Sequence, residues 1–222
     1  MGSEMCIRDR ASNWIQTGNT VNQTSTTGGA SASLANKAYS VTIPNDQPSS
    51  VSKVYFGNVC LGAGGGFTLG FWSNKNGEAK MNDNGGNGPE LALLVSLNLR
   101  NANGTAFDPA NYNSFRNWLL SANATNMAYM LSAQLAAMEL NVEGGSVNGG
   151  SMVFYPGLGF ISINDLMTAA NNELGLHGLT IAQTADRAYQ EKLKTALDQA
   201  NNNLNFVQGS PATCAAPIFP AN

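Results

Sequence analysis

Few side chains in this sequence could catalyse a reaction or bind a metal ion. His177 is the only histidine, and the surrounding Gly175-Leu-His-Gly178 is typical of the end of a helix. A serine- or cysteine-type hydrolase needs an activated nucleophile and an orienting acid beside its histidine, and the sequence has no Gly-x-Ser-x-Gly motif. One histidine and a bridged cysteine pair cannot complete a zinc site. We therefore predict a solvated loop histidine, no catalytic residue, no metal ion and no cofactor.

The acidic residues offer two further kinds of chemistry. Asp83 lies in Asn82-Asp-Asn-Gly-Gly-Asn-Gly88, whose oxygen atoms could bind calcium, but the spacing and closing glutamate of an EF-hand are missing. Two carboxylates flanking a sugar could hydrolyse a glycoside, and the candidates are Glu78, Asp83, Glu90, Glu139 and Glu143. Glu139 falls on a predicted helix whose opposite face is apolar, which favours a solvated helix face. The sequence thus predicts a protein that is not an enzyme, with an extracellular hydrolase as the weaker alternative.

Aromatic residues could instead bind a sugar by stacking. Phe71 and Trp72 are the candidate ligand contacts, although a pair just after a glycine-rich segment is more often part of a core. Trp118 is predicted to share one helix face with Phe115 and Leu119, and so to be structural. A carbohydrate-binding module is therefore an alternative function.

The composition favours an extracellular protein. Of 222 residues 43% are apolar and only 11% are charged, so asparagine, serine, threonine and glycine must keep the chain soluble. The net charge is −3 and no lysine or arginine run occurs, which argues against nucleic-acid binding. Apolar stretches fall far short of the roughly 18 residues of a membrane span, so no membrane insertion is expected. We predict a secreted or cell-surface protein whose partner is an extracellular protein or a glycan.

The cysteines support the same location. Residues 1–10, which include Cys6, match nothing that follows and resemble a translated sequencing adapter, so they are treated as a non-native leader. We expect the natural N-terminus, with any signal peptide, to be missing. Cys60 and Cys214 remain, and an even pair in a secreted chain predicts a disulfide. This bridge would join the two ends of the helical part of the chain.

The N-terminal part is predicted to be β-structure. Apolar and polar residues alternate in Tyr39–Ile43, and a second strand is expected over 51–59, whereas 17–33 has no periodicity and indicates a long loop. Two or three strands do not form a stable sheet alone, so residues 11–60 are interpreted as the C-terminal strands of a truncated β-sandwich. Residues 61–66 are predicted to be a flexible glycine-rich hinge, because they lack the lysine of a phosphate loop.

Helical spacing begins at Phe67, so the predicted fold class is α+β, with strands followed by a mainly α-helical module at 67–210 and an extended tail at 211–222. Helices are expected at 90–99, after Asp108-Pro109, at 126–141 after a Thr125 cap, from Ser162 to Gly175, and from Thr184 to Phe206, with a short strand at 152–155. The last helix is expected to turn Tyr189, Leu193, Leu197, Ala200 and Leu204 inward.

Gln134 falls on the apolar face of the 126–141 helix. A buried amide needs hydrogen-bond partners, and we expect Gln134 to find them in the backbone of the irregular loop near residues 70–76. Replacing Gln134 by leucine is accordingly expected to lower the melting temperature.

Two segments resemble known families. Trp14-Ile-Gln-Thr17, Tyr39-Ser-Val-Thr-Ile43 and Val54-Tyr-Phe-Gly-Asn58 resemble the last strands of the B-type repeat domains of bacterial surface adhesins. The resemblance implies a prealbumin-like β-sandwich that serves as a stalk. Some of these domains bind calcium, but the acidic loop required is absent here.

The helical part resembles an uncharacterised module that follows such repeats in secreted bacterial proteins. The module opens with Gly-Tyr-Trp-Lys-Asn-His, and Gly70-Phe-Trp-Ser-Asn-Lys75 matches it at Gly70, Trp72 and Asn74. Its Gln-Leu-x-Ala-Ala-x-Leu-Asn helix corresponds to Gln134-Leu-Ala-Ala-Met-Glu-Leu-Asn141. Trp72 and Asn74 in the matched opening, and Gln134 and Trp118 on apolar helix faces, are predicted to be structural. The resemblance implies a non-catalytic structural or interaction module of a multi-domain, adhesin-like surface protein.

Overall fold

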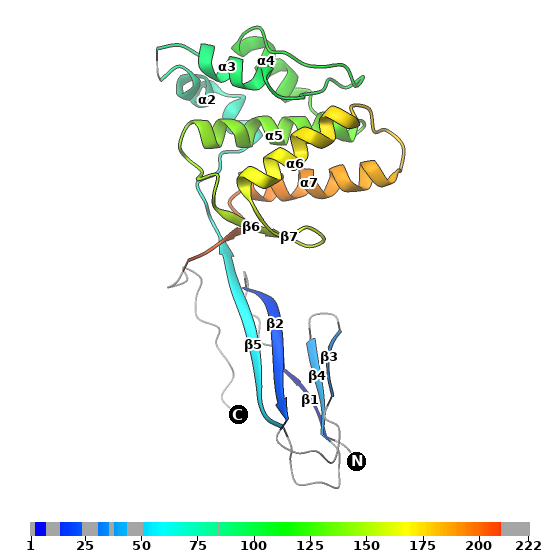
Figure 1. Cartoon of the computed structure of the whole chain (residues 1–222). Helices are drawn as coiled ribbons and strands as arrows, with labels where there is room; N and C mark the ends of the chain where they lie inside the picture. Colours follow the sequence, from blue (N-terminus) through cyan, green and yellow to red (C-terminus); the bar gives the residue numbers. More distant parts are fainter. Residues whose placement is uncertain are drawn as a thin grey trace. The chain divides into compact units, whose positions relative to one another are not determined.

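The chain forms two compact units. The computed structural model describes residues 3–7, 14–23, 31–35, 38–43, 51–83 and 85–209, with the side chains of residue 15 and of residues 59–209 except residue 84. The first unit consists of two stretches of chain, one up to Leu61 and one from Gln208 onward. Within it, the Gln208 backbone N–H donates to the Cys60 carbonyl at 2.9 Å. The second, from Gly62 to Val207, is called the helical unit (Figure 1). The fold is mixed α+β, as the sequence predicts.

The first unit contains the strands β1 (Ser3–Ile7), β2 (Trp14–Gln23), β3 (Ser31–Ala35), β4 (Ala38–Ile43) and β5 (Val51–Gly62). β4 lies between β1 and β3, and β2 pairs with β5, all antiparallel. The strands predicted at 39–43 and 51–59 are confirmed. The prediction of a long loop at 17–33 is wrong at both ends of that range, because β2 and β3 include residues there. Strand β1 lies in residues 1–10, which were interpreted as a non-native leader. The β-sandwich stays a prediction. The predicted Cys60–Cys214 disulfide and the extended tail at 211–222 cannot be compared with the structure, because Cys214 and the tail lie outside the described residues.

Within the described residues, the helical unit has seven helices and a small antiparallel sheet. The helices are α1 (Leu69–Trp72), α2 (Lys75–Met81), α3 (Gly88–Val95), α4 (Tyr112–Leu120), α5 (Met127–Glu143), α6 (Ile163–Leu176) and α7 (Ala185–Asn201). The strands are β6 (Met152–Tyr155), β7 (Gly159–Ser162) and β8 (Phe206–Val207), with β6 between the other two. None of these helices combines the length and apolar character that a membrane span requires.

Helix α5 forms the centre of the helical unit. Thirteen of its 17 residues are buried, which is typical of a helix that is apolar on nearly every side. Helices α1, α3, α6 and α7 pack against it. Figure 1 shows α2, α3 and α4 on one side of α5, and α6 and α7 on the other. The fully buried Ala133, Ala136 and Ala137 leave space for neighbouring helices to approach closely.

Local capping residues set the ends of the helices. The predicted N-caps of α6 and α7 are confirmed, since Ser162 Oγ accepts from the Asp165 N–H at 3.1 Å and Thr184 Oγ1 from the Arg187 N–H at 3.2 Å. Three other helix ends differ from their predicted positions. The N-cap of α4 is Asn111 instead of Asp108, the N-cap of α5 is Asn126 instead of Thr125, and α7 ends at Asn201 instead of Phe206.

Some elements and core positions were predicted wrongly or missed. Helices α1 and α2 and strand β7 were not predicted, and the helix expected at 90–99 is α3, which ends at Val95. Tyr189 and Leu204 were expected inside the core, but they are 39% and 62% exposed. Because α7 ends at Asn201, Leu204 lies beyond the helix that would have turned it inward.

The glycines predicted to form a hinge are instead held in place. Asn203 Oδ1 accepts hydrogen bonds from the N–H groups of Gly64, Gly65 and Gly66 at 3.1, 2.8 and 2.8 Å, and Asn203 Nδ2 donates to the Gly66 carbonyl at 2.8 Å. A Cβ on Gly66 would lie 2.4 Å from the Ala200 carbonyl oxygen, so only glycine fits there. We call this group the Asn203 clasp, and it corrects the flexible-linker prediction for these three glycines.

Gln134 is buried, but its predicted partner is wrong. Gln134 Nε2 donates to Asp198 Oδ1 at 3.2 Å, and Gln134 Oε1 accepts from Asn201 Nδ2 at 2.8 Å. Both partners lie on α7 and not in the loop near residues 70–76. The amide therefore joins α5 to α7.

Replacing Gln134 by leucine should lower the free energy of unfolding by about 1 kcal/mol, because Asn201 and Asp198 each lose one side-chain partner. The loss is limited, since Asn201 Nδ2 also donates to the Gln134 backbone carbonyl at 3.1 Å, which leucine retains. Thermal unfolding followed by circular dichroism should show a melting temperature lower by about 3 °C. Gln183→Leu, at an exposed position, is the control. An unchanged melting temperature for Gln134→Leu would contradict the assignment.

Candidate functional site

Trp72, a predicted ligand contact, lies inside the core. Its ring is only 1% exposed and its Nε1 donates to Asn141 Oδ1 at 3.1 Å. Phe71 is half-buried, with its ring stacked on Phe67 at a centroid distance of 4.1 Å. The prediction that Trp72 contacts a ligand is therefore wrong, because no face of the indole ring is open to a sugar.

The same region joins the two motifs on which the helical resemblance rests. Asn141 Oδ1 also accepts from the Phe67 N–H at 3.0 Å, and Asn141 Nδ2 donates to the Phe67 carbonyl at 2.9 Å and to Asn201 Oδ1 at 2.9 Å. Asn74 caps α2 by accepting from the Asn76 N–H at 2.8 Å. The opening motif and the central helix are thus fastened together through Asn141.

The acidic residues proposed for glycoside hydrolysis do not form a sugar-binding cleft. Glu78 is exposed. Asp83, Glu90 and Glu143 line one cavity of about 20 Å³, which has room for about one water molecule. Burial, and secondarily the negative charge of Glu143, raises the pKa of the Glu139 carboxyl above its usual value.

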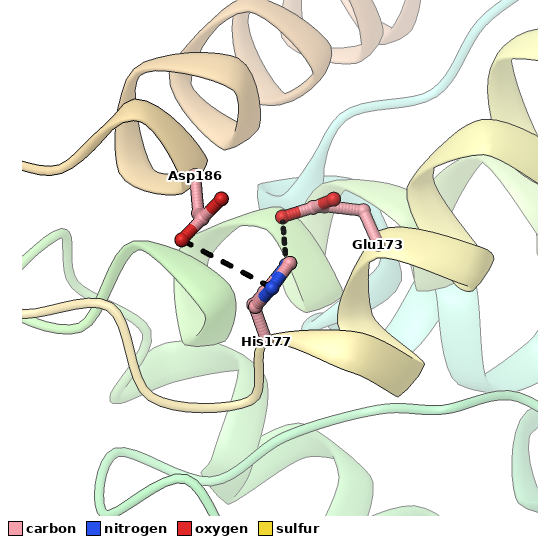
Figure 2. Close-up of side chains that lie close together, drawn as sticks. All are labelled: Glu173, His177 and Asp186. Atoms are coloured by element: carbon pink, nitrogen blue, oxygen red, sulfur yellow. Dashed lines mark hydrogen bonds and ion pairs between the residues drawn. The ribbon is translucent and has the colours of Figure 1, made fainter.

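Three potential metal ligands meet where α6 ends and α7 begins. Figure 2 shows Glu173 in the last turn of α6, His177 at its C-cap and Asp186 in the first turn of α7. His177 Nδ1 lies 2.9 Å from Glu173 Oε1, and His177 Nε2 lies 4.0 Å from Asp186 Oδ2. One donor atom from each residue lies within 4.8 Å of the others. The Glu173 side chain is 9% exposed, against 40% for His177 and 50% for Asp186.

A buried polar network fixes the loop that carries His177. Gln190 Nε2 donates to the His177 carbonyl at 2.8 Å and to Glu173 Oε1 at 3.4 Å, while Gln190 Oε1 accepts from Thr180 Oγ1 at 2.6 Å. Arg187 Nη1 donates to the Thr180 carbonyl at 2.6 Å. His177 and Glu173 are therefore held by residues whose own positions are fixed, as the donors of a binding site need to be, whereas Asp186 lies on the exposed side of the cluster.

The sequence did not predict this cluster. His177 was expected to be a solvated loop residue, whereas its imidazole is half-buried and paired with Glu173. Glu173 and His177 are four residues apart on one helix, and this spacing is enough to predict that their side chains meet. Asp186 gave no such signal, because only the path of the loop over 178–184 brings it beside the imidazole ring.

A second candidate site is an open groove beside α4. The groove has a volume of about 690 Å³ and is lined by Asn101, Ala102, Asn103, Thr105, Phe107, Asn117, Trp118, Ser121, Asn123 and Tyr129. The Phe107 ring stacks on Trp118 at a centroid distance of 4.3 Å with 3° between the planes. Trp118 Nε1 donates to the Arg100 carbonyl at 3.2 Å, which fixes the ring pair. The sequence placed Trp118 on a helix face but gave no sign of the groove.

The lining of the groove is polar but uncharged. It contains amides, hydroxyls and aromatic rings, and none of its residues is an aspartate, glutamate, lysine or arginine. Within the described residues, the Asn117 amide group and Asn103 Nδ2 make no hydrogen bond, which leaves them able to bind a ligand. Burial raises the pKa of the Tyr129 hydroxyl, although a hydrogen bond with Ser121 acts in the opposite direction. The groove therefore remains neutral around physiological pH.

The mixed α+β fold and the neutral groove do not by themselves name a family. No family model, no curated protein and no solved structure matches the chain. The likeness to B-type adhesin repeats and to the helical module of secreted proteins stays a prediction based on the quoted residues.

Proposed function

We propose that the chain is a non-catalytic interaction module of an exported, adhesin-like surface protein, and that its groove binds an uncharged glycan. The observation that carries the proposal is the lining of the groove. Neutral sugars present hydroxyl groups for amide hydrogen bonds and apolar ring faces for aromatic side chains. The groove supplies both, and its volume is within the range of small-ligand sites.

The absence of ionisable acids and bases from the lining supports binding over catalysis. General acid–base chemistry at a sugar needs two carboxyl groups or an equivalent pair. The only titratable lining residue is Tyr129, whose hydroxyl donates to the Trp118 carbonyl. The low share of charged residues and the predicted Cys60–Cys214 disulfide support export.

The proposal is tested by screening the full chain against an array of neutral and acidic glycans, then measuring affinity for the best neutral glycan by calorimetry. Phe107→Ala should weaken binding about tenfold, because loss of a stacked ring costs roughly 1 kcal/mol or more. Asn117 is exposed, so Asn117→Ala should not disturb the core. This variant should weaken glycan binding several-fold, because the hydrogen bond between the Asn117 amide and the glycan is lost.

Phe160→Ala is the matched control, because Phe160 is also partly exposed but lies on β7, outside the groove lining. It should leave the affinity unchanged. The affinity should also stay constant from roughly pH 6 to 9, since tyrosine titrates near 10 and burial moves Tyr129 higher. The proposal fails if no glycan binds, if Phe107→Ala and Asn117→Ala both bind normally, or if only acidic glycans are retained.

A further inference from the structure

We infer that Glu173, His177 and Asp186 bind one divalent transition-metal ion, with Zn²⁺ as the ion of best fit. The three residues come from the end of α6, its C-cap and the start of α7, and their donor atoms lie within 4.8 Å of one another. This site is separate from the groove, because none of the three residues lines it.

The donor set selects the class of ion. Calcium and magnesium prefer oxygen ligands alone, whereas an imidazole nitrogen suits zinc and its neighbours in the first transition row. Two carboxylates and a neutral imidazole carry a charge of −2, which a divalent ion neutralises. Three protein ligands and one open position are typical of a tetrahedral zinc ion that also holds a water molecule.

The surroundings leave space for that fourth ligand. His177 and Asp186 line an open pocket of about 330 Å³, formed by the loop between α6 and α7. Glu173, in contrast, is buried, and its Oε1 is oriented by both His177 Nδ1 and Gln190 Nε2. The cluster thus has one fixed buried donor and two donors on an open side, so an ion can enter from solvent.

For the Glu173–His177 pair, little rearrangement separates the ion-free arrangement from a bound one, and Asp186, whose donor atom lies within 4.8 Å of the others, moves closer from the exposed side. In the present structure His177 Nδ1 and Glu173 Oε1 lie 2.9 Å apart, within hydrogen-bond distance. Two ligands on a tetrahedral zinc ion lie about 3.4 Å apart at the usual bond lengths. Binding at Nδ1 therefore moves these two atoms apart by about 0.5 Å and breaks the hydrogen bond, and the neutral imidazole then carries its proton on Nε2.

A titration of the tag-free full chain with Zn²⁺, followed by calorimetry, tests the inference. One ion per chain should bind, and Zn²⁺ should raise the melting temperature. Asp186→Asn and His177→Ala, both at partly exposed positions, should each weaken binding by more than about tenfold, the minimum loss caused by removing even an outer partner. Circular dichroism of the ion-free variants should match that of the parent.

Asp165→Asn is the matched control. Asp165 also carries a negative charge in the first turn of a helix, but it lies at the start of α6 and takes no part in the cluster. This variant should bind Zn²⁺ as the parent does, which separates ligation from a general effect of helix-terminal charge.

His177 is the only histidine, so its ring nitrogens can be followed by NMR without ambiguity. Zn²⁺ should shift one ring nitrogen to a metal-bound position, and a magnesium or calcium salt should not. The inference is overturned if Zn²⁺ does not bind at millimolar concentration, if binding leaves the imidazole signals unchanged, or if Asp186→Asn and His177→Ala bind as tightly as the parent.

Discussion

Replacing Asn141 by alanine should lower the free energy of unfolding of the helical unit by about 4 kcal/mol, one of the largest losses expected from a single substitution. The Asn141 side chain is fully buried and makes four hydrogen bonds, two to the Phe67 backbone and one each to Trp72 and Asn201. Alanine leaves all four partner groups without it. The Trp72 and Asn201 groups are buried and the two Phe67 groups are partly buried, and each unpaired group costs roughly 1 kcal/mol.

Urea unfolding followed by far-ultraviolet circular dichroism measures this loss, because the helices lie in the helical unit. Asn113→Ala, at an exposed position on α4, should change stability by no more than about 0.5 kcal/mol. A loss below about 1 kcal/mol for Asn141→Ala would mean that the four bonds add little to the stability of the fold.

Arg187→Met should be the second most damaging substitution, at about 3 kcal/mol, because charge-assisted hydrogen bonds are lost from a buried site. Arg187 Nη1 donates to the carbonyls of Thr180 and Thr125 at 2.6 and 3.2 Å, and Nη2 donates to that of Ala124 at 2.8 Å. Methionine retains most of the apolar stem but leaves three carbonyl groups without this donor.

The effect of Arg187→Met should be concentrated in the loop before α7. Hydrogen exchange should increase first at residues 177–184, since the guanidinium group holds that loop against the start of α5. Arg116→Met is the control, because Arg116 is exposed and its Nε makes one bond, to the Ser73 carbonyl at 3.0 Å. Equal losses of stability for the two variants would rule out the special role of Arg187.

Helices and caps that depend on neighbouring residues could be predicted from the sequence. Ser162 and Thr184 were correctly placed as N-caps, because a hydroxyl group can reach the N–H three residues later in any tertiary setting. At the start of α5 several polar residues compete, and a tertiary contact decides between them. Asn126 caps the helix while its Oδ1 also accepts from the Thr180 N–H at 2.9 Å, 54 residues away.

The candidate sites were harder to predict for the same reason. Glu173 and His177 are neighbours on one helix, so their pairing could be predicted from spacing alone. Asp186 reaches them only because Gln190 and Arg187 fix the loop in between. The groove depends on Phe107 stacking on Trp118 from a separate loop, and no periodicity in the sequence encodes that contact.

The Asn203 clasp determines where an external load would act on the helical unit. It hydrogen-bonds residues near the beginning of this unit to a residue near its end, so the chain enters and leaves the unit at one place. A unit with adjacent ends tolerates insertion into another chain, or circular permutation with a short linker. Tension that reaches the two ends of this unit, past the Cys60–Gln208 hydrogen bond and the predicted disulfide at Cys60, would fall on the four bonds of the clasp before it strained the helices behind them.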